Sequence, residues 1–497
     1  MVNFILNDSN PYDLESSHKQ YTHDQDKSLH PKLTYKNTLR LLEETYPDNN
    51  YVLSEFTHDD DIYIFNFSDG FYNQRGKGIT SSQSKASAIM EYVERFSWLN
   101  FDYKRAANYT KESFNSLSTT HNIKNIAKCF NLYDSPYKDE LMELIKAIPL
   151  DWVQGYSLTS NSLTHYPVNW NNTYNSSNGL SAGNNKEEAI SQGICEVIER
   201  HNLSHFILNY KESEIRFIDH QSIESTLVKE LLSYYKNKNI NILLIDASFP
   251  LEAPMVIACG IDPSPQKEVV RIGYGFGCHT DPEKAIIRAI TEYTQGRKIL
   301  LEKKELAKDF DFKTGQWQFR LNLDMDYIIK HAKVIKASSM PNIKDNDFQI
   351  EIQRLVDLFR HKSFELMIIN KTHPKLNIPV YRVFSPDLYG VKEMHNVGKS
   401  EFFLIVQLYY HAGMISEAKA FYEKHFKSII HSFNDMFPVI QHYLNKLSLG
   451  TKFNIDIFKN NLRPDSIPLS EACKENYIEA LKATNHIMKK YDSVNKS

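Results

Sequence analysis

The chain has 497 residues, of which 41% are hydrophobic, and a formal net charge of −3. This length allows roughly two to four domains with a large core, and the near-neutral charge gives no basic bias of the kind that nucleic-acid-binding proteins show. The first residues do not resemble a signal peptide, no run approaches the roughly 18 apolar residues of a membrane span, and the five scattered cysteines form no C-x-x-C pair, so we expect a cytoplasmic protein without a membrane or nucleic-acid partner.

The predicted elements begin with a polar arm over residues 1–50. Apolar residues at helical spacing predict that this arm ends in a helix over 35–47. Residues 61–67 (DIYIFNF) alternate between apolar and polar side chains and therefore predict a strand. A second helix is predicted over 138–148, where the sequence reads KDELMELIKAI.

Runs rich in Val and Ile follow and predict further strands. Three of them lie at 240–246, 254–261 and 268–275, and one or two more lie within 362–372 and 378–386. From residue 396 onward, apolar residues at helical spacing predict helix pairs similar to tetratricopeptide repeats. The predicted organisation is an arm (1–50), an α+β domain (51–395) and a C-terminal α-helical module (396–497).

One short string occurs three times. It reads Glu91-Tyr-Val-Glu94-Arg95, then Glu196-Val-Ile-Glu199-Arg200, and in varied form Glu292-Tyr-Thr-Gln295-Gly-Arg297. Residues three apart share a helix face, so each full copy presents two carboxylates side by side with an arginine next to them. A single copy would be read as an ordinary solvated helix face. Three copies, 105 and 96 residues apart, instead predict strand–helix units that recur along the chain. A doubly wound parallel sheet is the alternative, although it favours shorter periods.

The carboxylates of this repeated string suggest a metal site. Glu91, Glu94, Glu196 and Glu199 come from two helices and provide the oxygen ligands that Mg²⁺ prefers. A small residue stands three positions before the first glutamate of each copy: Ala88, Gly193 and Ala289.

Glycine-rich segments precede all three predicted helices. They contain Gly76-Lys77-Gly78, Gly179 to Gly183, and Gly273 to Gly277. We expect them to be loops that lead into capped helices, with Asn184 or Asn185 capping the second helix and Asp281 capping the third. Free N–H groups at such helix starts suit phosphate. Neither a P-loop nor G-x-G-x-x-G matches these segments, so any nucleotide site must be of another kind.

Three stretches together resemble the YcaO family. They read GKGITSSQSKASAIMEYVER, SNGLSAGNNKEEAISQGICEVIERH and GYGFGCHTDPEKAIIRAITEYTQGR, and they occur in the family's order. Weaker likeness extends over roughly 60–395. The resemblance implies a mixed α+β fold whose motif helices form an ATP site without a P-loop. It also implies ATP- and magnesium-dependent activation of a peptide backbone amide, which gives an azoline, a thioamide or an amidine.

The resemblance also implies roles for single residues. The metal ligands would be Glu91, Glu94, Glu196 and Glu199, and Arg200, Arg288 and Glu292 would lie at the ATP phosphates. Ser181, Asn184 and Glu188 would contact the nucleoside or phosphates, and Lys77 would contact phosphate. Many azoline-forming members end in a proline-rich tail, whereas this chain ends KKYDSVNKS. The general base therefore has no assignment, and His279 is a candidate whose alternative role is local hydrogen bonding.

Three functions remain open at this point. The first is an ATP-dependent enzyme that forms azolines or thioamides in ribosomal peptide natural products. The second is an accessory factor for methylthiolation of a small-subunit ribosomal protein, and the third is a non-catalytic ATP-binding scaffold. We expect a peptide or protein substrate and a separate partner protein that recognises the substrate or delivers sulfur, and a homodimer is an assembly to test.

Overall fold

The computed structural model describes residues 11–60, 62–70, 72–100, 109–118, 138–167, 177–264, 271–306 and 323–388, and a few isolated positions between 414 and 423. Apart from those positions, the predicted helical module of 396–497 lies outside the described residues. The chain divides into two compact units. Unit 1 comprises Met1–Arg95, Leu158–Ser160 and Asn178–Met394, and unit 2 comprises Phe96–Ser157, Asn161–Ser177 and His395–Ser497. The domain boundaries at 50 and 395 stay predictions.

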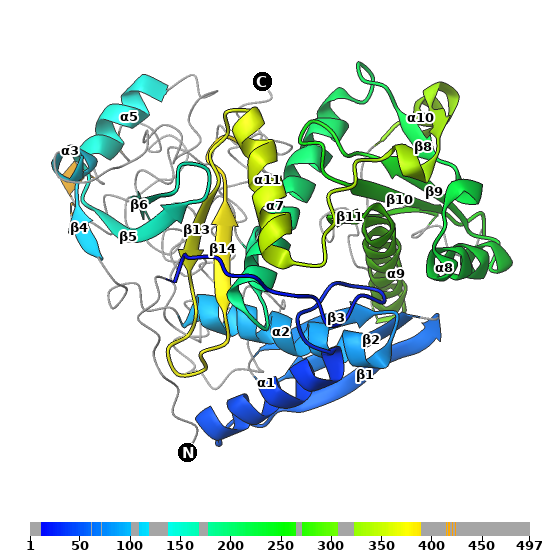
Figure 1. Cartoon of the computed structure of the whole chain (residues 1–497), viewed down its shortest axis with the longest axis horizontal. Coiled ribbons are helices and arrows are strands. Elements are labelled where there is room, and N and C mark those ends of the chain that lie inside the picture. Colours follow the sequence, from blue (N-terminus) through cyan, green and yellow to red (C-terminus); the bar gives the residue numbers. More distant parts are fainter. Residues whose placement is uncertain are drawn as a thin grey trace. The chain divides into compact units, whose positions relative to one another are not determined.

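Unit 1 contains the three repeated motifs, each on a long helix (Figure 1). The motif helices are α2 (Ser81–Leu99), whose last turn belongs to unit 2, α7 (Lys186–Asn209) and α9 (Pro282–Leu306). The other helices of this unit are α1 (Pro31–Thr45), α8 (Thr226–Asn237), α10 (Met325–His331) and α11 (Phe348–His361). The helix predicted over 35–47 is thus confirmed as α1, which begins one turn earlier at a proline.

The strands of unit 1 form three groups. The first is antiparallel and consists of β1 (Val52–Asp60), β2 (Ile62–Ser68) and β3 (Asn73–Gly78). The second has the order β11-β10-β9-β8-β12, with β8 (Arg216–Ile218), β9 (Asn241–Asp246), β10 (Met255–Ile261), β11 (Ile272–Cys278) and β12 (Lys333–Ile335). In the third, β14 (Val380–Phe384) pairs with both β13 (Met367–Asn370) and β7 (Leu180–Ala182). The predicted strands at 61–67, 240–246 and 254–261 are confirmed, and 268–275 is shifted toward 272–278.

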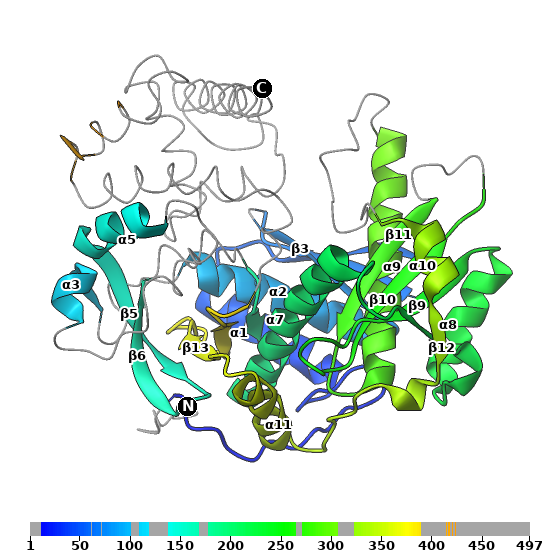
Figure 2. The same ribbon diagram turned by 90° about the horizontal axis from the view of Figure 1, so that it is seen from above.

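Most of these strand pairs are antiparallel. Within unit 1, β8 and β12 form the one parallel pair among the described pairs. The predicted α+β class is therefore confirmed, and the doubly wound parallel alternative is wrong. Helices α8 and α9 both pack on the sheet that contains β9, β10 and β11, and Figure 2 shows α9 alongside β10 and β11.

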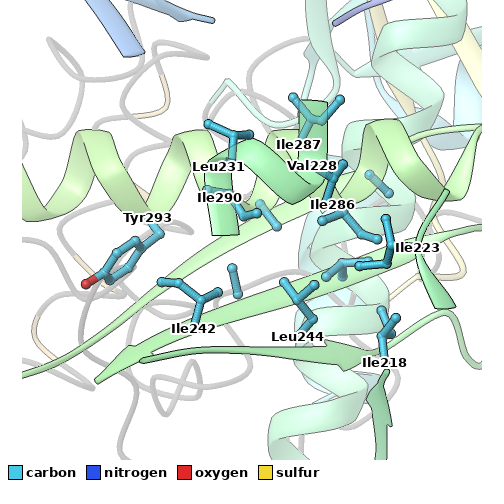
Figure 3. Close-up of a cluster of buried hydrophobic side chains, with 14 of the residues drawn as sticks. Ile218, Ile223, Val228, Leu231, Ile242, Leu244, Ile286, Ile287, Ile290 and Tyr293 are labelled. Carbon is cyan, nitrogen blue, oxygen red and sulfur yellow. The ribbon is translucent and has the colours of Figure 1, made fainter. Parts of the chain in front are cut away.

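The core of this layer is aliphatic (Figure 3). Helix α9 contributes Ile286 and Ile290, which are fully buried, and strand β9 contributes Ile242 and Leu244. Helix α8 adds Val228, together with Leu231 and Tyr235 one and two turns further on. The burial of these residues sets the rotation of α9 about its axis against the sheet, and with it the direction in which Glu292 is presented.

The glycines expected in loops lie mostly on strands, which corrects that prediction. Gly76 belongs to β3 and Gly275 to β11. A Cβ at Gly76 would lie 2.1 Å from the backbone nitrogen of Ala88, and one at Gly275 would lie 2.2 Å from the carbonyl oxygen of Ala289. In the first and third repeats, the small residue before the Glu-x-x-Glu/Gln string is therefore where a strand glycine crosses the motif helix. Gly179 alone of these lies in a turn with positive φ, at +72°.

The predicted helix caps are confirmed. Asn185 is the N-cap of α7, and its side chain accepts a hydrogen bond from the Glu188 N–H at 2.9 Å. Asp281 Oδ1 accepts the Glu283 N–H at 3.0 Å, directly before Pro282 at the first position of α9. Both motif helices therefore begin where the sequence predicted.

The N-terminal arm is held against the helix starts of unit 1 by polar contacts. The Glu15 N–H donates to Glu187 Oε1 at 2.9 Å, and the Ser17 N–H donates to Asp347 Oδ1 at 3.0 Å. Lys19 Nζ lies 2.7 Å from Asp26 Oδ2 and 2.5 Å from a carboxylate oxygen of Glu351, and all three side chains are buried. The described part of the arm is thus an integral part of the unit.

Unit 2 contains β4 (Thr110–Glu112), β5 (Leu150–Ser157) and β6 (Ser162–Pro167), paired antiparallel, with the helices α3 (Phe114–Leu117) and α5 (Lys138–Ala147). Helix α5 confirms the helix predicted over 138–148. The buried indole of this unit is Trp152 of β5, whose Nε1–H donates to the Glu112 carbonyl at 2.9 Å. No helix in the described part of either unit is both long and apolar enough to cross a membrane.

Candidate functional site

Most of the predicted phosphate- and metal-binding residues belong to one ionic group in unit 1. Its members are Lys77, Glu91, Glu94, Glu196, Glu199, Arg200, Arg288 and Glu292. They come from strand β3 and from all three motif helices. Residues more than 200 positions apart in the sequence thus act on one another electrostatically.

On helix α2, the motif arginine folds back on its own carboxylates. Arg95 Nη1 lies 2.8 Å from Glu94 Oε1, and Arg95 Nη2 lies 3.5 Å from Glu91 Oε1. Burial raises the pKa of Glu94 to about 8; the charge of Arg95 opposes this rise, and the charges of Glu196 and Glu91 add to it. Glu94 therefore needs a cation if it is to be ionised at neutral pH.

Helix α7 repeats this arrangement. Arg200 Nη2 lies 3.5 Å from Glu199 Oε1, and Glu199 Oε2 accepts the backbone N–H of Cys278 at 3.1 Å. Burial raises the pKa of Glu196, a shift that Arg200 and Arg95 oppose and that the charge of Glu199 increases. Burial thus disfavours the ionised form of Glu196 on α7 as it does that of Glu94 on α2.

On helix α9, positive charges outweigh the burial of the motif carboxylate Glu292. Lys77 Nζ, from β3, lies 2.9 Å from Glu292 Oε2. Burial alone would raise the pKa of Glu292, but the charges of Lys77, Arg200 and Arg288 outweigh it, so the pKa is lowered. Arg288 Nη1 in turn donates to Gln192 Oε1 of α7 at 2.6 Å.

The arginines also connect successive motif helices. The charge of Arg95 on α2 acts on Glu196 of α7, and the charge of Arg200 on α7 acts on Glu292 of α9. Each motif arginine is therefore shared between its own glutamate and the first glutamate of the next repeat. The third repeat ends this series, because Arg297 instead forms a buried ion pair at 2.6 Å with Asp262, the residue directly after β10.

The residues of this group fit Mg²⁺ and phosphate in their chemistry. Arg95 Nη1 and Arg200 Nη1 are buried and have no hydrogen-bond partner among the described residues. A phosphoryl oxygen is a suitable acceptor for such N–H groups, and a divalent cation would satisfy Glu94 and Glu196. Within the described ranges, however, no three His, Cys, Asp or Glu side chains converge closely enough to hold a metal. The four metal ligands stay a prediction, since here arginines hold these carboxylates.

Ser181, Asn184 and Glu188 lie together at β7 and the start of α7, about two helical turns before Glu196. The side-chain amide of Asn184 donates to Glu188 Oε2 at 2.9 Å, and the Ser181 hydroxyl donates to the Ala189 carbonyl at 2.5 Å. Their assignment to the nucleotide also stays a prediction.

Residues of the arm meet this second set, which the sequence did not suggest. Ser28 donates to Glu188 Oε2 from both its N–H, at 2.9 Å, and its hydroxyl, at 2.7 Å. Lys27 Nζ lies 3.5 Å from Glu188 Oε1, and the Thr34 hydroxyl donates to Asn184 Oδ1 at 2.9 Å. A polar arm carries no periodic signal, so only the folded chain relates it to α7.

His279 directly follows Cys278, the last residue of β11, whose N–H donates to Glu199. Its Nδ1 accepts the Asp281 N–H at 3.0 Å, and its Nε2 lies 3.7 Å from Asp26 Oδ2. Burial lowers the pKa of His279 to about 3; the Asp26 charge opposes this shift, and the Arg288 and Lys284 charges add to it. A neutral ring with Nδ1 engaged favours the local hydrogen-bonding role over that of a general base.

A separate cavity of about 570 Å³ lies where the arm meets the start of α9. Its walls include Lys19, Asp26, Lys284 and Lys344 but none of the motif glutamates. These charges are paired with carboxylates: Lys284 with Asp26, and Lys344 with Asp281 at 3.2 Å. We therefore place the candidate site among the motif helices and not in this cavity.

Besides Arg95, two side chains of the site lie outside the predicted set. Gln192 holds Arg288, as described above. Arg382 of β14 is buried and donates to the Asn178 carbonyl at 2.8 Å. Its charge opposes the rise in the pKa of Glu94 that burial causes. Gln192 lies four residues before Glu196, one helical turn away, and this spacing could have identified it.

A family model matches residues 75–389; its description is YcaO cyclodehydratase, ATP- and Mg²⁺-binding. Two solved structures have the same fold. A heterocyclase in complex with substrate and cofactor has a TM-score of 0.62 at 22% identity, covering 77% of this chain and 55% of its own. YcaO from Methanopyrus kandleri, bound with AMPPCP and Mg²⁺, has a TM-score of 0.55 at 18% identity, covering 77% and 97%.

Similar sequences give less functional detail. An uncharacterized protein of Methanothermobacter thermautotrophicus is 24% identical over 358 residues, which is 68% of this chain and 88% of that protein. The ribosomal protein S12 methylthiotransferase accessory factor YcaO of Escherichia coli is 26% identical over 246 residues, or 45% and 40%. The chain thus spans well under two thirds of the length of the heterocyclase and of the Escherichia coli factor.

Proposed function

The chain belongs to the YcaO family, and from this premise we propose that it is an ATP- and Mg²⁺-dependent enzyme that activates a backbone amide of a peptide. The observation that carries the proposal is the convergence of three motif helices on one ionic group, in which Glu94 and Glu196 lack sufficient positive charge. A nucleotide with its metal supplies what this group lacks: a divalent cation for the carboxylates and oxygen acceptors for the arginines.

The residues of the group divide into two kinds. Glu91, Glu94, Glu196 and Glu199 would hold Mg²⁺, while Lys77, Arg200 and Arg288 would bind phosphate oxygens, with Glu292 orienting Lys77. The nucleoside end would lie toward Ser181, Asn184 and Glu188. Since Glu188 precedes Glu196 by about 12 Å along α7, the two sets suit the two ends of one extended ligand.

The reaction needs a phosphoryl acceptor. In the proposed chemistry, a nucleophile adds to the amide carbonyl carbon, and the resulting oxyanion takes the γ-phosphoryl group of ATP. Phosphate then leaves with the former amide oxygen. Preorganised arginines and lysines stabilise the charge that develops on the transferring group. A Cys, Ser or Thr side chain of the substrate gives an azoline, and a sulfide donor gives a thioamide.

Binding can be tested with the double substitution Glu196→Gln plus Glu199→Gln. Both changes remove negative charge from a buried cluster, so we expect a folded protein that has lost detectable ATP affinity in the presence of Mg²⁺. Isothermal calorimetry measures the affinity, and circular dichroism checks the fold. The matched control is Glu224→Gln plus Glu230→Gln, two exposed carboxylates at helix α8. Unchanged ATP affinity in the folded Glu196/Glu199 variant would contradict the proposal.

An accessory role in ribosomal-protein methylthiolation is the second candidate. It is supported by the similarity to the Escherichia coli factor. A non-catalytic scaffold is less well supported, because buried carboxylates such as Glu94 are costly to retain without a use. Mass spectrometry of a peptide incubated with the chain, ATP and Mg²⁺ separates the catalytic candidate from the other two. Loss of water indicates an azoline, exchange of oxygen for sulfur indicates a thioamide, and an unmodified peptide favours the accessory or scaffold role.

A further inference from the structure

Arg95 occupies an unusual place among the charges of the candidate site. It is the last residue of the α2 motif, and its guanidinium contacts the carboxylates of both Glu91 and Glu94. Its charge also acts on Glu196 of α7. These are three of the four carboxylates predicted to bind Mg²⁺. Burial opposes the charge of Arg95, but Glu94, Glu91 and Glu196 outweigh burial and raise its pKa. The guanidinium is therefore a permanent cation within the acidic cluster.

The contacts of Arg95 are electrostatic but poorly aligned. Its Nη1 lies 2.8 Å from Glu94 Oε1 and yet makes no hydrogen bond, and the contact of Nη2 with Glu91 is long, at 3.5 Å. Arg297, a buried arginine at the far end of the third motif, differs in this respect. It donates a well-formed hydrogen bond of 2.6 Å to Asp262. Arg95 thus favours the ionised form of these carboxylates by its charge without being locked to them.

We propose that Arg95 is the internal counter-ion of the metal site: it takes the place of Mg²⁺ among Glu91, Glu94 and Glu196 while no metal is bound, and is released when the metal arrives. This accounts for the absence, within the described ranges, of a preformed three-carboxylate cluster, because Glu91 and Glu94 are turned toward the guanidinium. Metal and arginine compete for the same oxygens, so Arg95 keeps the site folded without metal and weakens metal binding.

The inference rests on the proposed function, in which these glutamates are the metal ligands, but it can be tested with Mg²⁺ alone. The variant is Arg95→Gln in the full chain, measured by thermal unfolding in EDTA and in excess MgCl₂ without nucleotide. Removing the cationic partner of a carboxylate cluster destabilises the folded state, so in EDTA we expect the melting temperature of Arg95→Gln to fall by about 5 °C or more. Mg²⁺ should restore most of this loss, whereas the wild type should respond less.

The matched control is Arg297→Gln. It removes a buried arginine of motif helix α9 from its carboxylate partner Asp262, which lies outside the predicted metal site. We expect it to lower the melting temperature equally in EDTA and in MgCl₂. Calorimetry with MgCl₂ and no nucleotide adds a second measurement, in which Arg95→Gln should bind Mg²⁺ about tenfold more tightly than the wild type.

Arg95→Lys keeps a positive charge and guards against a variant that does not fold in EDTA. We expect it to behave between the wild type and Arg95→Gln, both in its melting temperature in EDTA and in Mg²⁺ affinity. The counter-ion role is overturned if Mg²⁺ fails to restore the melting temperature of Arg95→Gln, so that this variant behaves like Arg297→Gln. It is also overturned if the wild type binds Mg²⁺ as tightly as Arg95→Gln and Arg95→Lys do. A wild type that binds no ATP would instead overturn the proposed function. The two outcomes are distinguishable because the Mg²⁺ test contains no ATP.

Discussion

Lys77 Nζ on β3 lies 2.9 Å from Glu292 Oε2 on α9, so an ion pair joins the first and the third repeat of the sequence. Both side chains are about one quarter exposed. The pair is therefore reachable from solvent and lies beside Arg200 and Arg288, whose charges also act on Glu292. Lys77 can reach a phosphate there while Glu292 limits how far its ammonium moves.

The first prediction concerns this lysine. Lys77→Ala should weaken ATP affinity about tenfold, the effect of losing one charge-assisted contact to phosphate. Because the ion pair is partly exposed, the free energy of unfolding should change by no more than about 1 kcal/mol. Lys77→Arg is the conservative control and should retain most of the affinity. Calorimetry decides the question, and equal ATP affinity in the wild type and Lys77→Ala would remove Lys77 from the phosphate contacts.

The second prediction concerns the crossing of β11 and α9. A Cβ on Gly275 would lie 2.2 Å from both the Ala289 carbonyl oxygen and the Tyr293 nitrogen, and these are backbone atoms that cannot rotate away. Gly275→Ala should therefore lower the free energy of unfolding by about 3 kcal/mol or more. Gly70→Ala is the control, because it has open space and a positive φ of +87°, and it should cost about 1 kcal/mol. Chemical denaturation that ranks the two variants equally would contradict this packing.

The third prediction is a pH dependence in EDTA. Glu94 has a folded-state pKa of about 8, raised from 4.5 mainly by burial, so between these values the folded chain holds a proton that the unfolded chain has lost. The free energy of unfolding must then fall as pH rises, by up to about 1.4 kcal/mol per pH unit. Buried His279, with its pKa lowered from 6.5 to about 3, has the opposite effect up to pH 6.5.

Above pH 7 buried Lys371, whose pKa is lowered from 10.5 to about 7, opposes this fall. The contribution of Glu94 is therefore measured between pH 6.5 and 8 as the difference in slope between the wild type and Glu94→Gln. Thermal unfolding in EDTA across this range measures it. Glu94→Gln should reduce the slope, while Mg²⁺ should abolish it in the wild type by favouring the ionised carboxylate. Equal slopes in the metal-free wild type and in Glu94→Gln would show that Glu94 is not held protonated.

The sequence predicted what depends on local periodicity. Glu91, Glu94, Glu196 and Glu199 could be placed on helices because each pair is three residues apart with apolar neighbours, and the caps Asn185 and Asp281 gave the starts of α7 and α9. Strand β9 likewise followed from a run of Ile and Leu residues. These signals act within one or two turns of chain, where spacing determines which side chains share a face.

The sequence could not predict what depends on contacts between distant segments. The glycines of β3 and β11 were expected to form loops for phosphate, because a glycine that opens a turn and one that lets a strand cross a helix look alike in sequence. The pairing of Lys77 with Glu292, and of the Ser28 hydroxyl with Glu188, spans more than 150 residues in each case. No periodic pattern in one sequence encodes such pairs.

The buried cluster formed by Lys19, Asp26 and Glu351 has a practical consequence for dividing the protein. The family match begins only at residue 75, and a fragment cut there would appear to keep every motif. It would, however, leave Glu351 without its ammonium partner, Glu188 without Ser28 and Lys27, and the glycine strand β3 without its neighbour β2. Such a fragment should aggregate or unfold on expression, so soluble versions of the enzyme should retain the chain from at least residue 11.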